Sequence, residues 1–153
     1  MSGTIVCGVT ESPDGRSAAD LAHALGLRLG LRLVLVHVID DVPTGGEESL
    51  TSRRRHSGAE QTLAEVARAT GNGAERRIVL GERAAALAQV AAEEGADMIV
   101  VGSRSTGFGS RKLRSTLARE LEATTPIPVV VAPPSTRKRS DHRLSVTGGA
   151  GAQ

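Results

Sequence analysis

The chain has 153 residues, which is enough for one domain with a substantial core and too few for two domains of ordinary size. Its single aromatic residue, Phe108, predicts an aliphatic core and excludes aromatic base stacking as a way of binding nucleic acid. The net charge is +2, but the segment from residue 133 onward carries +3, while residues 1–132 hold 15 basic and 16 acidic residues. We therefore expect no nucleic-acid partner.

The single cysteine, Cys7, excludes an internal disulfide and is typical of a reducing compartment. No apolar run approaches the length of a membrane span, and the first residues lack the basic start and long apolar block of a signal peptide. We expect a cytoplasmic protein without membrane association.

The first half of the chain predicts two strands and two helices. Residues 4–9 form a short apolar strand typical of one buried on both faces, and Ser12-Pro13-Asp14 then begins a helix that ends at Gly30. A second strand covers 33–39, and residues 40–52 are predicted to be a loop. The next helix carries its apolar residues at Leu63, Val66 and Ala67 and ends at the glycines of 71–73.

The second half continues the same alternation. We expect strands at 77–80, 98–101 and 128–132, a helix from about 84 to 95, and another with Leu113, Leu117 and Leu121 on one face. Residues 135–153 show no periodicity and are predicted to be a disordered basic tail after a domain of residues 1–134. Alternating strands and helices predict an α/β fold, an open five-stranded parallel sheet with helices on both faces.

The segment from Gly102 to Thr116 is the most informative part of the chain. A strand ends at Gly102, a loop follows, and Ser115-Thr116 begins a helix. The loop contains Arg104 and three further basic residues but no acidic one. Because the first N–H groups of a helix have no intrahelical partner, this arrangement favours an anion such as phosphate.

At these residues the chain resembles the universal stress protein (UspA-like) family, over about residues 3–134. Nucleotide-binding members carry G-x2-G-x9-G-[ST] after the fourth strand, and here Gly102, Ser105, Ser115 and Thr116 stand at those positions, with serine replacing two glycines. The resemblance implies a Rossmann-like, adenine nucleotide alpha hydrolase-like fold, with strands one and four adjacent and ATP as the ligand.

The resemblance also assigns further site residues. Thr10 stands where ATP-binding members usually have an aspartate near the ribose, and Val38 matches the position that lines the adenine pocket. Arg104 is a candidate phosphate contact, because guanidinium groups bind phosphate well. Each position also has a structural interpretation: Gly102 as a turn glycine, Ser115 as a helix cap, Thr116 as a first-turn residue and Val38 as core.

The resemblance further implies a homodimer through the last strand, at Val129, Val130 and Val131. We expect a regulatory or binding module rather than an enzyme, because no nucleophile and base pair or metal-ligand spacing is evident. Two alternatives remain open: a stress protein that binds no nucleotide and acts through dimerisation and protein partners, and a slow ATP hydrolase.

Overall fold

The computed structural model describes residues 3–10, 13–39, 48–70, 73–103 and 116–133, and every structural statement below concerns these residues. Strands and helices alternate along the chain, as the sequence predicted. The elements are β1 (Thr4–Gly8), α1 (Pro13–Leu29), β2 (Arg32–Ile39), α2 (Glu48–Ala69), β3 (Glu75–Leu80), α3 (Arg83–Glu94), β4 (Met98–Val101), α4 (Thr116–Thr124) and β5 (Val129–Val131).

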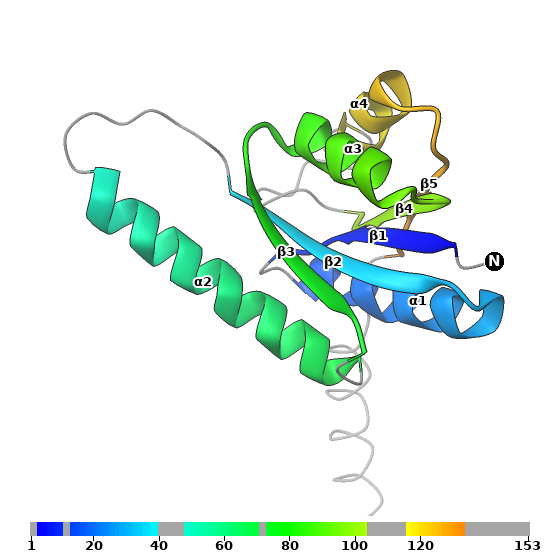
Figure 1. Cartoon of the computed structure of the whole chain (residues 1–153), viewed down its shortest axis with the longest axis horizontal. Coiled ribbons are helices and arrows are strands. Elements are labelled where there is room, and N and C mark those ends of the chain that lie inside the picture. Colours follow the sequence, from blue (N-terminus) through cyan, green and yellow to red (C-terminus); the bar gives the residue numbers. More distant parts are fainter. Residues whose placement is uncertain (1–2, 11–12, 40–47, 71–72, 104–115, 134–153) are drawn as a thin grey trace, which may run out of the picture.

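The five strands form one parallel sheet in the order β3-β2-β1-β4-β5. Helices α1 and α2 cover one face of it, and α3 and α4 cover the other (Figure 1). The predicted α/β fold class is therefore confirmed, together with the expected adjacency of the first and fourth strands. In this order the chain reverses its winding between β1 and β4, where an open α/β sheet usually binds its ligand.

Two aliphatic layers form the core, one on each face of the sheet. Alternate residues of β1 point to opposite faces, so Ile5 and Cys7 pack with α1 and α2, whereas Val6 packs with α3 and α4. Leu63 of α2 and Leu87 of α3 are central to the two layers and are almost completely buried. The predicted burial of Cys7 is confirmed: burial raises the pKa of its thiol to about 12.

The predicted loop at 40–52 is wrong in its second part, because α2 begins at Glu48. The first buried side chain described in this helix is Ala59, so the preceding residues lack the apolar periodicity by which a helix is found in a sequence. The third strand likewise begins at Glu75 rather than at residue 77. Its charged start lies at the edge of the sheet, which does not require an apolar pattern.

Other boundaries agree with the expectations to within one or two residues. Gly30 follows α1 with φ 68° and Gly95 caps α3 with φ 62°, a left-handed conformation that glycine adopts most readily. Leu121 of α4 is buried as predicted, and Leu117 packs against the same core layer. The predicted position of Leu113 and the predicted tail at 135–153 lie outside the described residues.

Three ion pairs join α3 to β2 and β3 near the amino ends of the strands, and a fourth joins β2 to β3. Arg32 lies 2.8 Å from Glu75 and 2.6 Å from Glu94, and Arg77 lies 2.9 Å from Glu93 and 3.2 Å from Glu94. Glu94 contacts both arginines and has a side chain only 19% exposed. The contacts of α3 fix this helix against the sheet near the amino ends of the strands, opposite the carboxyl edge.

Candidate functional site

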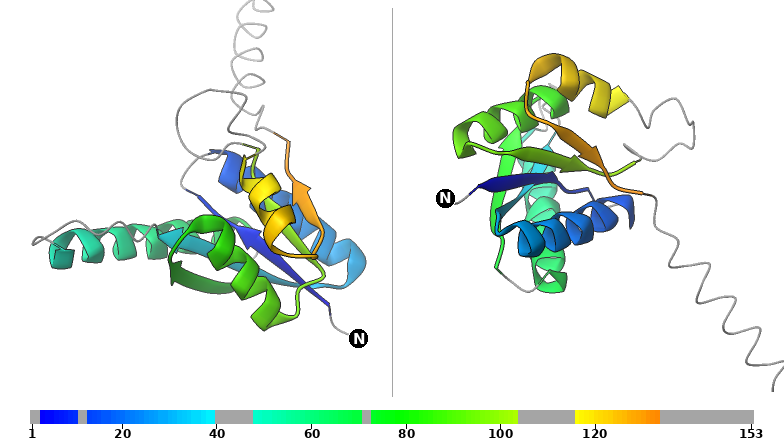
Figure 2. Two further views of the ribbon diagram at one scale, coloured as in Figure 1. Left: turned by 90° about the horizontal axis from the view of Figure 1, so that it is seen from above. Right: turned by 90° about the vertical axis from the view of Figure 1, so that its right-hand side faces the viewer.

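The candidate site lies at the carboxyl edge of the sheet, where β1 and β4 separate. The two strands pair up to Cys7 and Val100, after which β1 leads to α1 on one face and β4 leads towards α4 on the other (Figure 2). The last β1–β2 pair is Gly8 with Val36, and β2 continues three residues further to Ile39. The ends of three neighbouring strands therefore meet at this edge.

Thr10 follows β1 at this edge and is partly buried. Just before it, the Val9 amide donates a hydrogen bond of 2.8 Å to the Val36 carbonyl, which marks the end of the pairing with β2. The first turn of α1 packs directly on Thr10: a Cβ placed on Gly15 would lie 2.5 Å from the Thr10 carbonyl oxygen and 2.6 Å from its Oγ1. Because Gly15 has no side chain, the first turn of α1 can lie this close to Thr10 and to the site.

Gly102 directly follows β4 and is partly exposed, while the next residue, Ser103, is 6% exposed. The Ser103 Oγ atom is buried and has no hydrogen-bond partner in the described structure. A buried hydroxyl left in this state costs about 1–3 kcal/mol relative to one that is paired. Ser103 is therefore a polar group at the site whose hydrogen-bonding capacity is unused.

Val38 lies near the end of β2 and packs partly against the core layer on the α3 side. Val38 is therefore a packing residue. Because it lies near the carboxyl edge of the sheet, its side chain could also line a ligand pocket there. Adjacent strands are about 4.8 Å apart, so Val38 and Gly102, on strands separated by β1, are on the order of 10 Å apart across the sheet.

The structure brings some of the predicted site residues together and leaves others untested. Thr10, Val38 and Gly102 lie at one edge, and Thr116 is the first described residue of α4. Arg104, Ser105 and Ser115 lie outside the described residues. Two residues at this edge were missed: Ser103 occupies a variable position of the motif, whereas Gly15 could have been noticed as a glycine in the first turn of a helix.

The described residues give no sign of a metal site or of a membrane span. Within them, no group of three or more His, Cys, Asp or Glu residues could hold a metal ion. Nor, in the same part of the chain, is any helix both long enough and apolar enough to cross a bilayer. The described polar groups at the carboxyl edge include Thr10 and Ser103, whose hydroxyls suit hydrogen bonding to a ligand.

Comparison with known proteins identifies the same fold family. The Universal stress protein family matches residues 1–133 of the chain. A relative from Thermus aquaticus, the universal stress protein in the QAH/OAS sulfhydrylase 3′ region, is 33% identical over 137 residues, which cover 86% of this chain and 98% of that protein.

Two solved structures extend this comparison to the fold. The universal stress protein UspA from Lactobacillus plantarum matches with a TM-score of 0.76 at 17% identity, covering 87% of this chain and 99% of that one. A universal stress protein in complex with cAMP matches with a TM-score of 0.67 at 19% identity, covering 87% and 98%. These two structures show the fold, and the family match over residues 1–133 together with the relative that is 33% identical shows that the chain belongs to the universal stress protein family.

Proposed function

We propose that this protein is a cytoplasmic regulatory or binding module that weakly binds an adenine nucleotide, ATP, between the ends of β1 and β4. The observation that carries the proposal is the buried Ser103 hydroxyl, which has no partner in the described structure and follows Gly102 at this edge. A phosphate or ribose oxygen would satisfy it, and the hydroxyl can act as a donor or an acceptor.

Three further observations support a nucleotide at this edge. Thr10, Val38 and Gly102 lie at the carboxyl ends of three neighbouring strands, and the N-terminus of α4, whose described part starts at Thr116, would favour an anion. The cAMP complex belongs to a protein of the same fold, so an adenine nucleotide is a ligand that this architecture can accept. Arg104 would contribute positive charge to the phosphates.

Weak binding follows from the two serines of the motif. Ser105 and Ser115 stand where nucleotide-binding members have glycine, and a side chain there hinders the approach of backbone N–H groups to phosphate. A left-handed conformation at a residue with a Cβ costs on the order of 1–2 kcal/mol. Thr10 in place of aspartate removes a carboxylate that could bind the ribose.

Thermal unfolding with ATP tests the proposal. A ligand at 100 times its dissociation constant stabilises a protein by about 2.7 kcal/mol, which is roughly 5–10 °C in Tm for a domain of this size. We expect a smaller shift for the wild type in about 1 mM ATP and a larger one for the Ser105→Gly, Ser115→Gly double variant. A full-sized shift in the wild type would refute the role of the serines, and no shift in the glycine variant would refute the nucleotide site.

Ser103→Ala tests whether the Ser103 hydroxyl contacts the ligand. It removes one oxygen that has no partner in the described structure, so the free protein should keep or slightly raise its Tm. The shift produced by ATP in the glycine background should nevertheless fall by about half or more. An unchanged shift would show that the hydroxyl does not contact the ligand.

Mass spectrometry of the undenatured protein, purified from cells, separates the alternatives. Retention of a mass equal to ATP, ADP or AMP supports the proposal. A protein without ligand that also shows no ATP shift in the glycine variant would be a stress protein acting through dimerisation and protein partners. Release of ADP from added ATP at a steady rate would instead indicate a slow hydrolase.

A further inference from the structure

The first half of α2 projects beyond the sheet. Figures 1 and 2 show α2 extending past β3 in two perpendicular views, on the side where the helix begins. The side chains of residues 53–57 are all exposed, and the first buried one described is Ala59. From Glu48 to Ser57 the helix rises about 15 Å at 1.5 Å per residue. The side chains of residues 53–57 therefore do not contribute to the core.

The projecting part carries four consecutive basic or titratable residues, Arg53, Arg54, Arg55 and His56, which we call the basic ring. Successive residues of an α-helix are turned by about 100°, so four in a row span most of its circumference. If any side of the helix packed on the sheet at this level, at least one of the four would be buried. All four side chains are exposed, so the three arginines present positive charge over more than half of the helix circumference.

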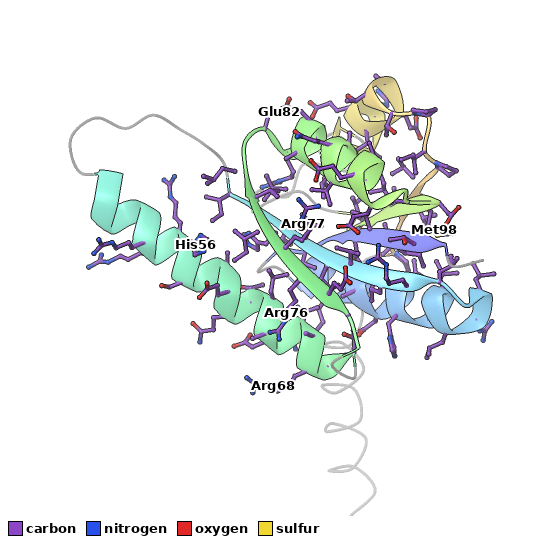
Figure 3. The ribbon with its side chains drawn as sticks, viewed as in Figure 1. His56, Arg68, Arg76, Arg77, Glu82 and Met98 are labelled. Atoms are coloured by element: carbon purple, nitrogen blue, oxygen red, sulfur yellow. The ribbon has the colours of Figure 1, made fainter. Side chains whose placement is uncertain are left out.

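Two arginines of the basic ring are available to a partner. In the described structure neither Arg53 nor Arg54 forms an ion pair with a carboxylate, and the 3.4 Å contact of His56 with Glu60 is a pair of exposed groups one turn apart. Figure 3 shows His56 on the projecting part of α2, with Arg68 at the opposite end of the helix. Exposed pairs of this kind contribute little to folding, so stability does not explain the cluster.

The chemistry of the ring selects its partner. Residues 1–132 hold one more acidic than basic residue, so the body as a whole exerts no net attraction on a long polyanion. Double-stranded nucleic acid is held by many phosphate contacts, and single strands are usually held by stacked aromatic residues, of which the chain has one. A short acidic segment of polypeptide instead matches the exposed guanidinium groups of Arg53 and Arg54, because guanidinium groups bind carboxylates well.

We propose that the basic ring on α2 is a docking surface for a short acidic segment of a partner protein. This proposal concerns a surface formed by α2 alone and is independent of nucleotide binding. It predicts weak, salt-sensitive binding, because exposed charge pairs are screened by ions.

Fluorescence anisotropy with a short labelled poly-glutamate peptide tests the surface on the full-length protein at low salt. We expect Arg53→Glu, Arg54→Glu to weaken binding about tenfold or more, because attraction is replaced by repulsion at two positions. The matched control, Arg68→Glu, Arg119→Glu, makes the same change in net charge at two exposed arginines elsewhere and should change binding about twofold or less. Both double variants should keep the wild-type Tm, since all four side chains are exposed.

Amide NMR of the wild type with the same peptide checks the location, and the shifts should concentrate at residues 53–57. Three outcomes would overturn the proposal: no binding by the wild type, equal losses in the two double variants, or peptide shifts centred away from the ring. Tighter binding to duplex DNA of similar charge, lost in the Arg53→Glu, Arg54→Glu variant, would also overturn it, since the partner would then be a nucleic acid.

Discussion

Gly15 is the residue whose identity the structure constrains most directly. A Cβ at this position would lie 2.5–2.6 Å from three atoms of Thr10, two of them in the backbone. We expect Gly15→Ala to lower stability by about 1–3 kcal/mol, because the turn between β1 and α1 must shift to admit a methyl group. Thermal and urea unfolding measure this effect.

Gly73→Ala is the control for that substitution. Nothing lies within 4 Å of a Cβ at Gly73, and its φ is not in the left-handed range. This variant should be neutral or stabilised by up to about 1 kcal/mol, since alanine restricts the unfolded chain. Helix propensity alone predicts that alanine also stabilises α1 at position 15, so a rise in Tm for Gly15→Ala would contradict the packing argument.

The buried thiol of Cys7 should make the free energy of unfolding depend on pH. Its thiol loses a proton near pH 9.0 when exposed, but burial raises the pKa to about 12 in the folded protein. Between these values the unfolded state gains free energy by ionising while the folded state keeps its proton. Stability should therefore fall as the pH rises above about 9, by up to about 1.4 kcal/mol per pH unit, with no effect at lower pH.

Urea unfolding of the wild type and of Cys7→Ala at several pH values isolates this effect. Cys7→Ala is less stable at neutral pH because it leaves a small void, but its stability should fall less steeply above about pH 9. Parallel curves for the two proteins would mean that the thiol ionises as readily in the folded state as in the unfolded one.

At the scale of the element, the sequence predicted best those segments that bury an apolar face. The five strands and the ends of α1 and α3 were found because buried valines, leucines and alanines repeat with the period of the structure and glycines follow the helices. The start of α2, residues 48–52, was predicted as loop because its sequence has no apolar repeat of helical period. The charged start of β3 was missed for a similar reason at the edge of the sheet.

The candidate site was predictable in position but not in detail. Strand order places the ends of β1 and β4 together, so Thr10 and Gly102 could be assigned to one edge from the resemblance. Ser103 could not be assigned, because its role depends on whether a nearby group satisfies a buried hydroxyl, which is a property of the folded structure. The same is true of Gly15, whose constraint is a contact across a turn.

The last strand, β5, is an edge strand through which two chains could associate. β5 is at one edge of the sheet and β3 at the other; Val131 of β5 is 43% exposed and Leu80 of β3 is 68% exposed. An exposed apolar edge favours pairing with another chain, and we propose that β5 forms the homodimer. Sedimentation at micromolar concentration should report a dimer, which Val131→Lys should dissociate. Leu80→Lys at the other edge is the control and should remain dimeric; the reverse pattern would place the interface at β3.

At the scale of the whole molecule, we predict that the tail of residues 135–153 is dispensable for folding. In the part of the chain that the structure describes, the buried apolar side chains of the two core layers run from Ile5 to Ala132. A variant ending at Pro134 should therefore keep the wild-type free energy of unfolding to within about 0.5 kcal/mol. Its net charge should change from +2 to −1, because the removed segment carries four basic residues and one acidic residue. Unfolding in urea and elution from a cation exchanger measure the two effects separately. Early elution with unchanged stability is the expected result, whereas a loss of more than about 1 kcal/mol would show that the tail packs on the body and belongs to the folded domain.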